Sequence, residues 1–153
     1  EVFGVDRSPA AIEEVQALAK KHSPGLSLDN FRVEDIEKMS FKDAAFDVVI
    51  SSAVLHFSSD IKHFNSMVSE MWRVLRPGGM FFSRLASSIG IEDRIRPAGK
   101  GRYKVPDGST RFLVDEVFLR EVSKQLGGRF LEPIKTVNVE GQRCMTTWCL
   151  RKD

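Results

Sequence analysis

The first nine residues, Glu-Val-Phe-Gly-Val-Asp-Arg-Ser-Pro, predict a strand that runs directly into a helix. Residues 2–5 are mostly apolar, as is typical of a short buried strand. Ser8 suits the N-cap of a helix, and Pro9 suits its first turn, where the missing N–H costs nothing. A strand followed at once by a helix favours an α/β arrangement, in which helices cover a sheet.

Asp6 lies at the carboxyl end of this predicted strand. In dinucleotide-type α/β folds, an acidic residue at such a position binds the two hydroxyls of a ribose, about 20 residues after a Gly-rich turn. Only five residues precede Asp6, and no Gly-x-Gly-x-Gly sequence occurs in the chain. We therefore expect an N-terminally truncated domain that begins at its second strand, without the first strand and the Gly-rich loop.

Strands and helices continue to alternate along the chain. Apolar residues at helical spacing predict helices over residues 9–21, 60–75 and 115–126. Short apolar runs predict strands at 28–33, 46–52 and 80–85, with Pro77-Gly78-Gly79 as a turn before the last, and an antiparallel hairpin at 130–139 and 143–150. This order predicts one α/β domain over residues 1–153, with a Rossmann-like, mostly parallel sheet and a C-terminal antiparallel hairpin.

Residues 86–112 lack periodicity and contain two prolines and four glycines. A connection of this length inside a compact domain is usually a lid or a binding loop. Its mixed charges, single tyrosine and glycines suit a lid over a polar substrate. A solvated surface insertion explains the same composition equally well.

The composition is that of an ordinary globular domain, with 42% hydrophobic residues and a formal net charge of +2. The basic residues are scattered, and their densest stretch, 94–104, forms no stripe, so nucleic acid is disfavoured as a partner. No apolar run reaches the roughly 18 residues of a membrane span, and we expect no membrane association.

Cysteine and histidine residues are few and widely spaced, which predicts no metal site. Cys144 and Cys149 lie five positions apart in one predicted strand, and this odd spacing sends their side chains to opposite faces. A disulfide between them is therefore not expected, and a reduced, cytoplasmic protein fits best.

Four motifs follow one another in order: Gly-Val-Asp-Arg-Ser at 4–8, Val-Glu-Asp-Ile-Glu-Lys-Met-Ser-Phe at 33–41, Phe-Asp-Val-Val-Ile-Ser-Ser-Ala-Val-Leu-His-Phe at 46–57, and Arg-Val-Leu-Arg-Pro-Gly-Gly at 73–79. Each is weak by itself. Their order and spacing closely resemble those of class I S-adenosylmethionine-dependent methyltransferases, from residue 1 to about residue 85.

The resemblance implies S-adenosylmethionine as the cofactor and suggests which residues would hold it. Asp6, with Arg7 beside it, would bind the ribose hydroxyls, while Asp35 would meet the exocyclic amine of adenine. The backbone N–H of Ile36 would bind a ring nitrogen. Two hydroxyl side chains would lie beside the methionine part of the cofactor, those of Ser51 and Ser52. Taken alone, the two aspartates are equally consistent with ordinary helix-start or turn residues.

His56 is the candidate catalytic residue. It follows the carboxyl end of the strand at 46–52, and open α/β sheets bind ligands on that side. Methyl transfer to an oxygen or nitrogen atom requires removal of a proton, and an imidazole with a pKa near 6.5 suits that role. Packing against Phe57 or capping a helix would explain the histidine equally well.

The chain shows no added recognition domain, so the resemblance implies methyl transfer to a small-molecule acceptor. The alternative is a non-catalytic cofactor-binding or regulatory module on the same fold, which the missing Gly-rich loop favours. In the family's sheet, the missing strand lies between the strands at 2–5 and 46–52. Direct pairing of these two strands, or a strand from a second copy in a homo-oligomer, would repair that gap.

Overall fold

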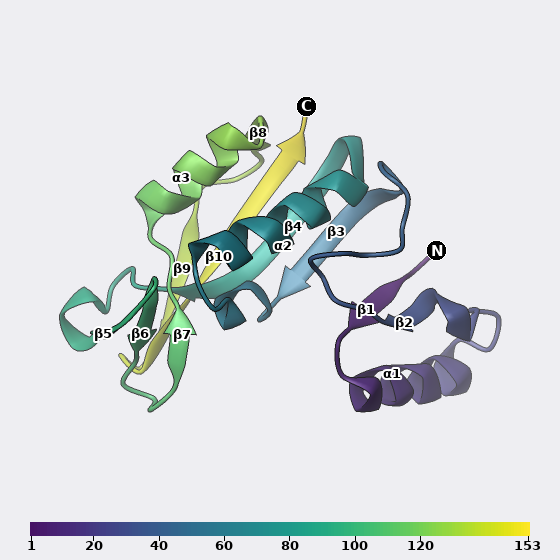
Figure 1. The fold of residues 1–153 in the computed structure, drawn as a ribbon, viewed down its shortest axis with the longest axis horizontal. Helices are drawn as coiled ribbons and strands as arrows, with labels where there is room; N and C mark the ends of the chain where they lie inside the picture. The colour runs from purple at the N-terminus through teal and green to yellow at the C-terminus, as the bar shows by residue number, and fades with distance from the viewer. The chain divides into compact units, whose positions relative to one another are not determined.

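The computed structural model describes all residues from Glu1 to Asp153, which form two compact units: an N-terminal unit, Glu1–Ser40, and a C-terminal unit, Phe41–Asp153 (Figure 1). The N-terminal unit consists of strand β1 (Gly4–Asp6), helix α1 (Pro9–His22), the 3-10 turn η1 (Leu28–Asn30) and strand β2 (Phe31–Val33). The strand predicted at 28–33 is therefore shorter than expected, because its first half is a 3-10 turn.

Strands β1 and β2 are parallel neighbours, with Gly4 opposite Phe31 and Asp6 opposite Val33. Helix α1 begins as predicted, since the Ser8 hydroxyl accepts a hydrogen bond from the N–H of Ala11 (3.4 Å) and Pro9 occupies the first turn. The helix packs its apolar side into a small core with β2. The buried members of that core are Ile12, Ala19 and Phe31.

The C-terminal unit is built on a five-stranded sheet. Its elements are β3 (Phe46–Ser52), η2 (Leu55–Phe57), α2 (Ile61–Val74), β4 (Leu75–Ser87), α3 (Glu116–Gln125), β8 (Gly128–Phe130), β9 (Lys135–Val139) and β10 (Arg143–Lys152). The order is β3-β4-β10-β8, and β9 pairs with the other end of β10. The β3–β4 pair is parallel, whereas β10 is antiparallel to β4, β8 and β9. The α/β class and the C-terminal hairpin, β9–β10, are thus confirmed.

Helices α2 and α3 cover one face of this sheet. Phe81 of β4 packs against Trp72 of α2 (ring centroids 6.3 Å apart) and against Trp148 of β10 (5.2 Å). The indole N–H of Trp148 donates a hydrogen bond to the hydroxyl of Ser123 on α3 (2.9 Å). Because side chains alternate along a strand, the odd-numbered residues of β4 face the helices and the even-numbered residues, such as Arg84, point away.

The turn predicted at Pro77-Gly78-Gly79 lies inside β4 and does not precede it. The strand kinks there, as shown by the positive φ of Gly78 (76°) and by a register shift against β3 between Phe46 and Val48. Gly79 is required by close packing, since a Cβ atom would lie 2.6 Å from the Leu75 side chain.

The segment at 86–112 is more regular than predicted. After β4 ends, it contains the turn η3 (Glu92–Arg94) and a three-stranded antiparallel sheet formed by β5 (Arg96–Gly99), β6 (Arg102–Lys104) and β7 (Thr110–Phe112). These strands have only three or four residues each, so they leave no clear hydrophobic period in the sequence.

Strand β1 pairs only with β2, and β3 pairs only with β4, so the two strands belong to separate sheets. On β3, Val48 and Ile50 are exposed to 44% and 68%. The predicted missing strand and a homo-oligomer stay predictions. No helix is both long enough and apolar enough to span a membrane. Cys144 and Cys149 are both buried and free.

Candidate functional site

The two predicted cofactor-binding aspartates follow neighbouring strand ends in the N-terminal unit. Asp6 ends β1 and Asp35 comes two residues after β2, so both lie near the carboxyl edge of this parallel pair. The backbone joins the two ends, because the N–H of Glu34 donates to the carbonyl of Asp6 (3.1 Å). The structure therefore brings Asp6 and Asp35 to one edge of the parallel pair, while their roles toward the cofactor stay predictions.

The hydrogen bonds around Asp6 leave room for a ligand. Its Oδ1 accepts a hydrogen bond from the N–H of Ser8 (2.8 Å), whereas Oδ2 accepts none within the chain. The carboxylate is exposed, as is Arg7 beside it. A carboxylate with one oxygen available at the start of a helix fits a ribose hydroxyl, since such charge-assisted hydrogen bonds are strong.

The loop after β2 is held in shape by its own side chains. The carboxylate of Glu34 accepts hydrogen bonds from the N–H and the hydroxyl of Ser40 (2.8 and 2.5 Å), which closes the loop. Asp35 Oδ1 accepts one from the N–H of Glu37 (3.2 Å). The N–H of Ile36 has no acceptor within the chain. This loop therefore presents one free donor and one carboxylate, which fits the edge of an adenine ring.

Ser51 and Ser52 end β3 in the C-terminal unit, with their side chains on opposite faces. Ser51 is 1% exposed and lies opposite Ser83 of β4, and both hydroxyls are buried without a hydrogen-bond partner. Ser52 is exposed. The exposed Ser52 side chain is therefore accessible to a cofactor, whereas the buried Ser51 could contact one mainly through its backbone atoms. Both roles stay predictions.

A cavity of about 220 Å³ lies beyond the carboxyl end of β3. Its polar lining comes from four elements and one loop: His56 on η2, Arg84 on β4, Arg111 on β7, Arg143 on β10, and Asp107 in the loop between β6 and β7. Ala53, which directly follows β3, also lines it. We refer to this cavity as the arginine pocket.

The ring of His56 is held in place by contacts with Ala86 and Phe57. The residue is 6% exposed, and its Nδ1 accepts a hydrogen bond from the N–H of Ala86 (3.2 Å). In a neutral ring with this bond, the proton lies on Nε2. The ring also contacts that of Phe57 (centroids 4.6 Å apart), as the packing alternative expected.

The pKa of His56 is lowered to about 4, first by burial and then by the positive charges of Arg111 and Arg143. Arg84 lowers it in the same direction. The imidazole is therefore neutral at pH 7, and it donates a hydrogen bond more readily than it accepts a proton. The base role assigned to His56 from the sequence stays a prediction, and the geometry favours a donor.

Arg84 and Arg143 were not expected to belong to a site, and Arg111 and Asp107 were expected only as part of the lid segment at 86–112. Arg84 interrupts the apolar strand at 80–85, which was the one available signal. The convergence of three arginines depends on the pairing of β4 with β10 and on the fold of residues 96–112, neither of which local sequence patterns reveal.

Residues 1–83 match the methyltransferase domain family, and this match covers more than half of the chain. The chain belongs to this family. It is a class I methyltransferase domain, and S-adenosylmethionine is the cofactor of the family, as the motifs predicted.

Curated relatives are methyltransferases of differing names. The domain is 30% identical over 101 residues to an arsenite methyltransferase of Aquipseudomonas alcaligenes, covering 62% of this chain and 28% of that protein. It is 32% identical over 125 residues to the phthiotriol/phenolphthiotriol dimycocerosates methyltransferase of Mycobacterium leprae, covering 80% and 39%. The chain thus spans well under half the length of these relatives.

A solved structure with the same fold is a SAM-dependent methyltransferase of Methanosarcina mazei (TM-score 0.76, 21% identity, covering 99% of this chain and 81% of that one). Another is the N-methyltransferase NodS of Bradyrhizobium japonicum in complex with S-adenosylhomocysteine (TM-score 0.67, 17% identity, covering 97% and 64%). These similarities confirm the Rossmann-like fold of the methyltransferase domain.

Proposed function

We propose that the protein transfers the methyl group of S-adenosylmethionine to a small-molecule acceptor. The observation that carries this proposal is the pair of free polar groups at the shared edge of β1 and β2, Asp6 Oδ2 and the N–H of Ile36, in a chain of this family. When bound, the cofactor supplies a methyl group on a positively charged sulfur atom.

The residues of the N-terminal unit would hold the nucleoside part of the cofactor. Asp6 would accept hydrogen bonds from the ribose hydroxyls, with Arg7 beside it. Asp35 would accept one from the adenine amine, and the N–H of Ile36 would donate to a ring nitrogen. The Glu34–Ser40 hydrogen bonds support this role because they hold the loop in place before the ligand arrives.

The relatives support a small-molecule acceptor without indicating which one. The names of two relatives contain arsenite and phthiotriol/phenolphthiotriol dimycocerosates, which share little chemistry. The acceptor must therefore be inferred from this chain's own pocket. The two free, buried cysteines support the cytoplasmic location that the sequence predicted.

The alternative is a non-catalytic cofactor-binding or regulatory module on the same fold, which would transfer no methyl group. One observation favours it: a structure with a TM-score of 0.72 to this chain is named as the [4+2]-cyclase SpnF, so the fold is also found in a protein named for another reaction. Cofactor binding with no release of its demethylated product would support this alternative.

Calorimetric titration of the full-length protein with S-adenosylmethionine and S-adenosylhomocysteine tests the proposal directly. We expect saturable binding of both at micromolar concentrations. Incubation with the methyl donor and a mixture of small-molecule acceptors should release S-adenosylhomocysteine, measured by mass spectrometry. Absence of heat with either compound well above micromolar concentrations would contradict the proposal.

A further inference from the structure

The arginine pocket carries an unbalanced positive charge. Three guanidinium groups line it, from Arg84, Arg111 and Arg143, and they face the single carboxylate of Asp107. Burial opposes ionisation of Asp107, but hydrogen bonds from Ser109 and the nearby arginines lower its pKa, so the carboxylate is charged. The pocket thus keeps an excess of positive charge at neutral pH.

The carboxylate of Asp107 does not neutralise the arginines. Its Oδ2 lies 3.8 Å from a guanidinium nitrogen of Arg143, a long ion pair, and its Oδ1 accepts hydrogen bonds from Ser109. Arg84 and Arg111 have no carboxylate within ion-pair distance. Elsewhere in the C-terminal unit, arginines lie directly against carboxylates, as Arg73 does with Asp43 and Glu70.

Arg111, one of the two arginines without a carboxylate partner, is held in position by an aromatic ring. The Arg111 guanidinium lies over the ring of Phe57, 4.8 Å from its centroid, and also donates to the carbonyl of Thr110 (3.2 Å). These two contacts involve one face and one N–H edge of the Arg111 guanidinium, and they restrict its position. A guanidinium so fixed loses little freedom on binding a carboxylate, which favours affinity.

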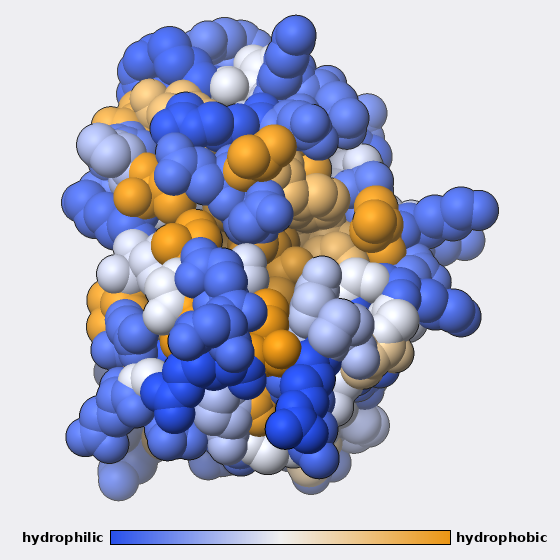
Figure 2. All heavy atoms as spheres, turned by 90° about the vertical axis from the view of Figure 1, so that its left-hand side faces the viewer, coloured by the Kyte–Doolittle hydropathy of each residue, from blue (hydrophilic) through white to orange (hydrophobic).

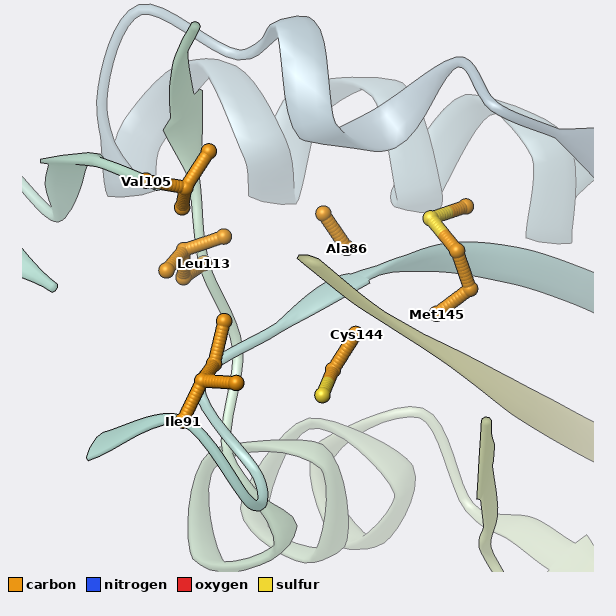
Figure 3. Packing of buried hydrophobic residues seen from close by; sticks show 6 residues of the cluster. All are labelled: Ala86, Ile91, Val105, Leu113, Cys144 and Met145. Atoms are coloured by element: carbon orange, nitrogen blue, oxygen red, sulfur yellow. The ribbon is translucent and has the colours of Figure 1, made fainter. Parts of the chain in front are cut away.

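The remaining wall of the pocket is apolar. Four residues line the pocket and also belong to a buried hydrophobic cluster: Ala86 and Met145, which lie on adjacent strands, and Val105 and Leu113. Figure 3 shows that Met145 and Cys144 leave β10 in opposite directions. On the side where β5–β7 lie, strongly hydrophilic atoms gather around exposed apolar ones (Figure 2). Such a pocket suits a molecule with an apolar body and an anionic group.

Resting on the proposed methyl transfer, we propose that the arginine pocket binds the methyl acceptor and that this acceptor is a small carboxylic acid, held by its carboxylate. Arg84, Arg111 and Arg143 bind the carboxylate, and His56 donates its Nε2 hydrogen to the same molecule. The volume of about 220 Å³ is below that of a typical drug-sized site, which favours a small acid.

Binding of benzoate, compared with its uncharged analogue benzamide, tests this assignment. The full-length protein is titrated with each compound, and the ring signals of His56 are followed by heteronuclear NMR. We expect benzoate to shift these signals saturably, and benzamide to bind at least tenfold more weakly, because only the anion pairs with guanidinium groups.

Variants of the arginines separate a specific site from general charge attraction. We expect Arg111→Gln and Arg84→Gln each to raise the dissociation constant for benzoate about tenfold. Arg111→Lys keeps the charge and should recover part of the affinity. Arg151→Gln is the matched control, since Arg151 is exposed, lies on the same strand as Arg143, and is about 27 Å along it at roughly 3.4 Å per residue.

Equal binding of benzoate and benzamide would overturn the assignment, as would arginine variants that bind benzoate like the wild type. A titration with S-adenosylhomocysteine on the same preparation separates this failure from failure of the proposed function. If the nucleoside binds and benzoate does not, only the acceptor assignment is wrong. If benzoate binds and the nucleoside does not, the pocket is an anion site but the methyl-transfer proposal, and the acceptor role with it, is wrong.

Discussion

The imidazole Nδ1 of His56 accepts a hydrogen bond from the backbone N–H of Ala86, 3.2 Å away, and this bond joins the turn after β3 to strand β4. The bond is buried and spans 30 positions of the sequence. Protonation of Nδ1 would break it and would place a positive charge among three arginines. The fold therefore requires the neutral ring, and the stability of the protein should depend on pH.

We expect the free energy of unfolding to decrease as the pH falls from 7.5 to 5. The pKa of His56 is about 4 in the folded state and about 6.5 in an unfolded chain, so the unfolded state binds the extra proton in this range. Stability is fully present above pH 6.5 and is lost progressively toward pH 4. At pH 5 the expected loss is about 2 kcal/mol, measured by urea denaturation.

The variant His56→Gln should have a flatter pH profile over the same range, because it removes the group that titrates. His22→Gln, which changes an exposed side chain on α1, should keep the wild-type profile. If both variants behave alike, the burial of a neutral His56 is not the cause of the pH dependence.

Asp6→Ala should weaken the affinity for S-adenosylhomocysteine by roughly ten- to a hundredfold, because charge-assisted hydrogen bonds to the ribose are lost and water only partly replaces them. Calorimetry measures this effect. Glu14→Ala removes a carboxylate from an exposed position of the same unit and should leave the affinity unchanged. Unaltered binding by Asp6→Ala would assign Asp6 to the helix start alone.

Ser123→Ala should destabilise the C-terminal unit by about 1–3 kcal/mol. The buried Ser123 hydroxyl accepts the hydrogen bond from the Trp148 indole and donates to the carbonyl of Leu119 (2.6 Å). Without it, the indole N–H is left buried and unpaired. Ser66→Ala, at an exposed position of α2, should change the midpoint of denaturation little. A similar small change in both variants would contradict the role of Ser123.

Gly79→Ala should destabilise the protein by roughly 1–3 kcal/mol, because the new methyl group would lie 2.9 Å from the carbonyl oxygen of Asp47 and 2.8 Å from that of Arg76. Backbone atoms cannot yield as a flexible side chain can. Gly25→Ala meets no atom within 4 Å and should be close to neutral. Thermal denaturation of the two variants compares them directly.

Local chemistry made the helix starts predictable. Ser8 caps its helix as expected, and the helices predicted from residues 60 and 115 begin one residue later because Asp60 and Asp115 act as their N-caps. The strand at 46–52 and the hairpin at the C-terminus were also recognisable, because their hydrophobic patterns are strong, even though Val48 and Ile50 of β3 are exposed and not buried. Asp6 was singled out by its position at a strand end and by the resemblance to the methyltransferase family, Asp35 only through that resemblance, and their cofactor roles stay predictions.

The features that escaped prediction depend on contacts between distant residues. The sheet β5–β6–β7 is held by backbone pairing of short strands, and the kink at Gly78 lies inside β4 next to the closely packed Gly79. The arginine pocket joins side chains from positions 84, 111 and 143, and only Arg84, which interrupts an apolar strand, is locally conspicuous. Only the pairing of β4 with β10 shows that two of them lie on the same face.

The two faces of strand β4 have different roles: its odd-numbered residues pack in the core, and two of its even-numbered residues line the arginine pocket. Phe81, Ser83 and Leu85 face the helices and are buried, while Arg84 and Ala86 on the opposite face line the arginine pocket. Substitutions at positions 84 and 86 can therefore change the charge and size of the pocket while the packing beneath α2 and α3 is preserved. A strand organised in this way lets related proteins diverge in the molecules they accept without redesigning the core that folds them.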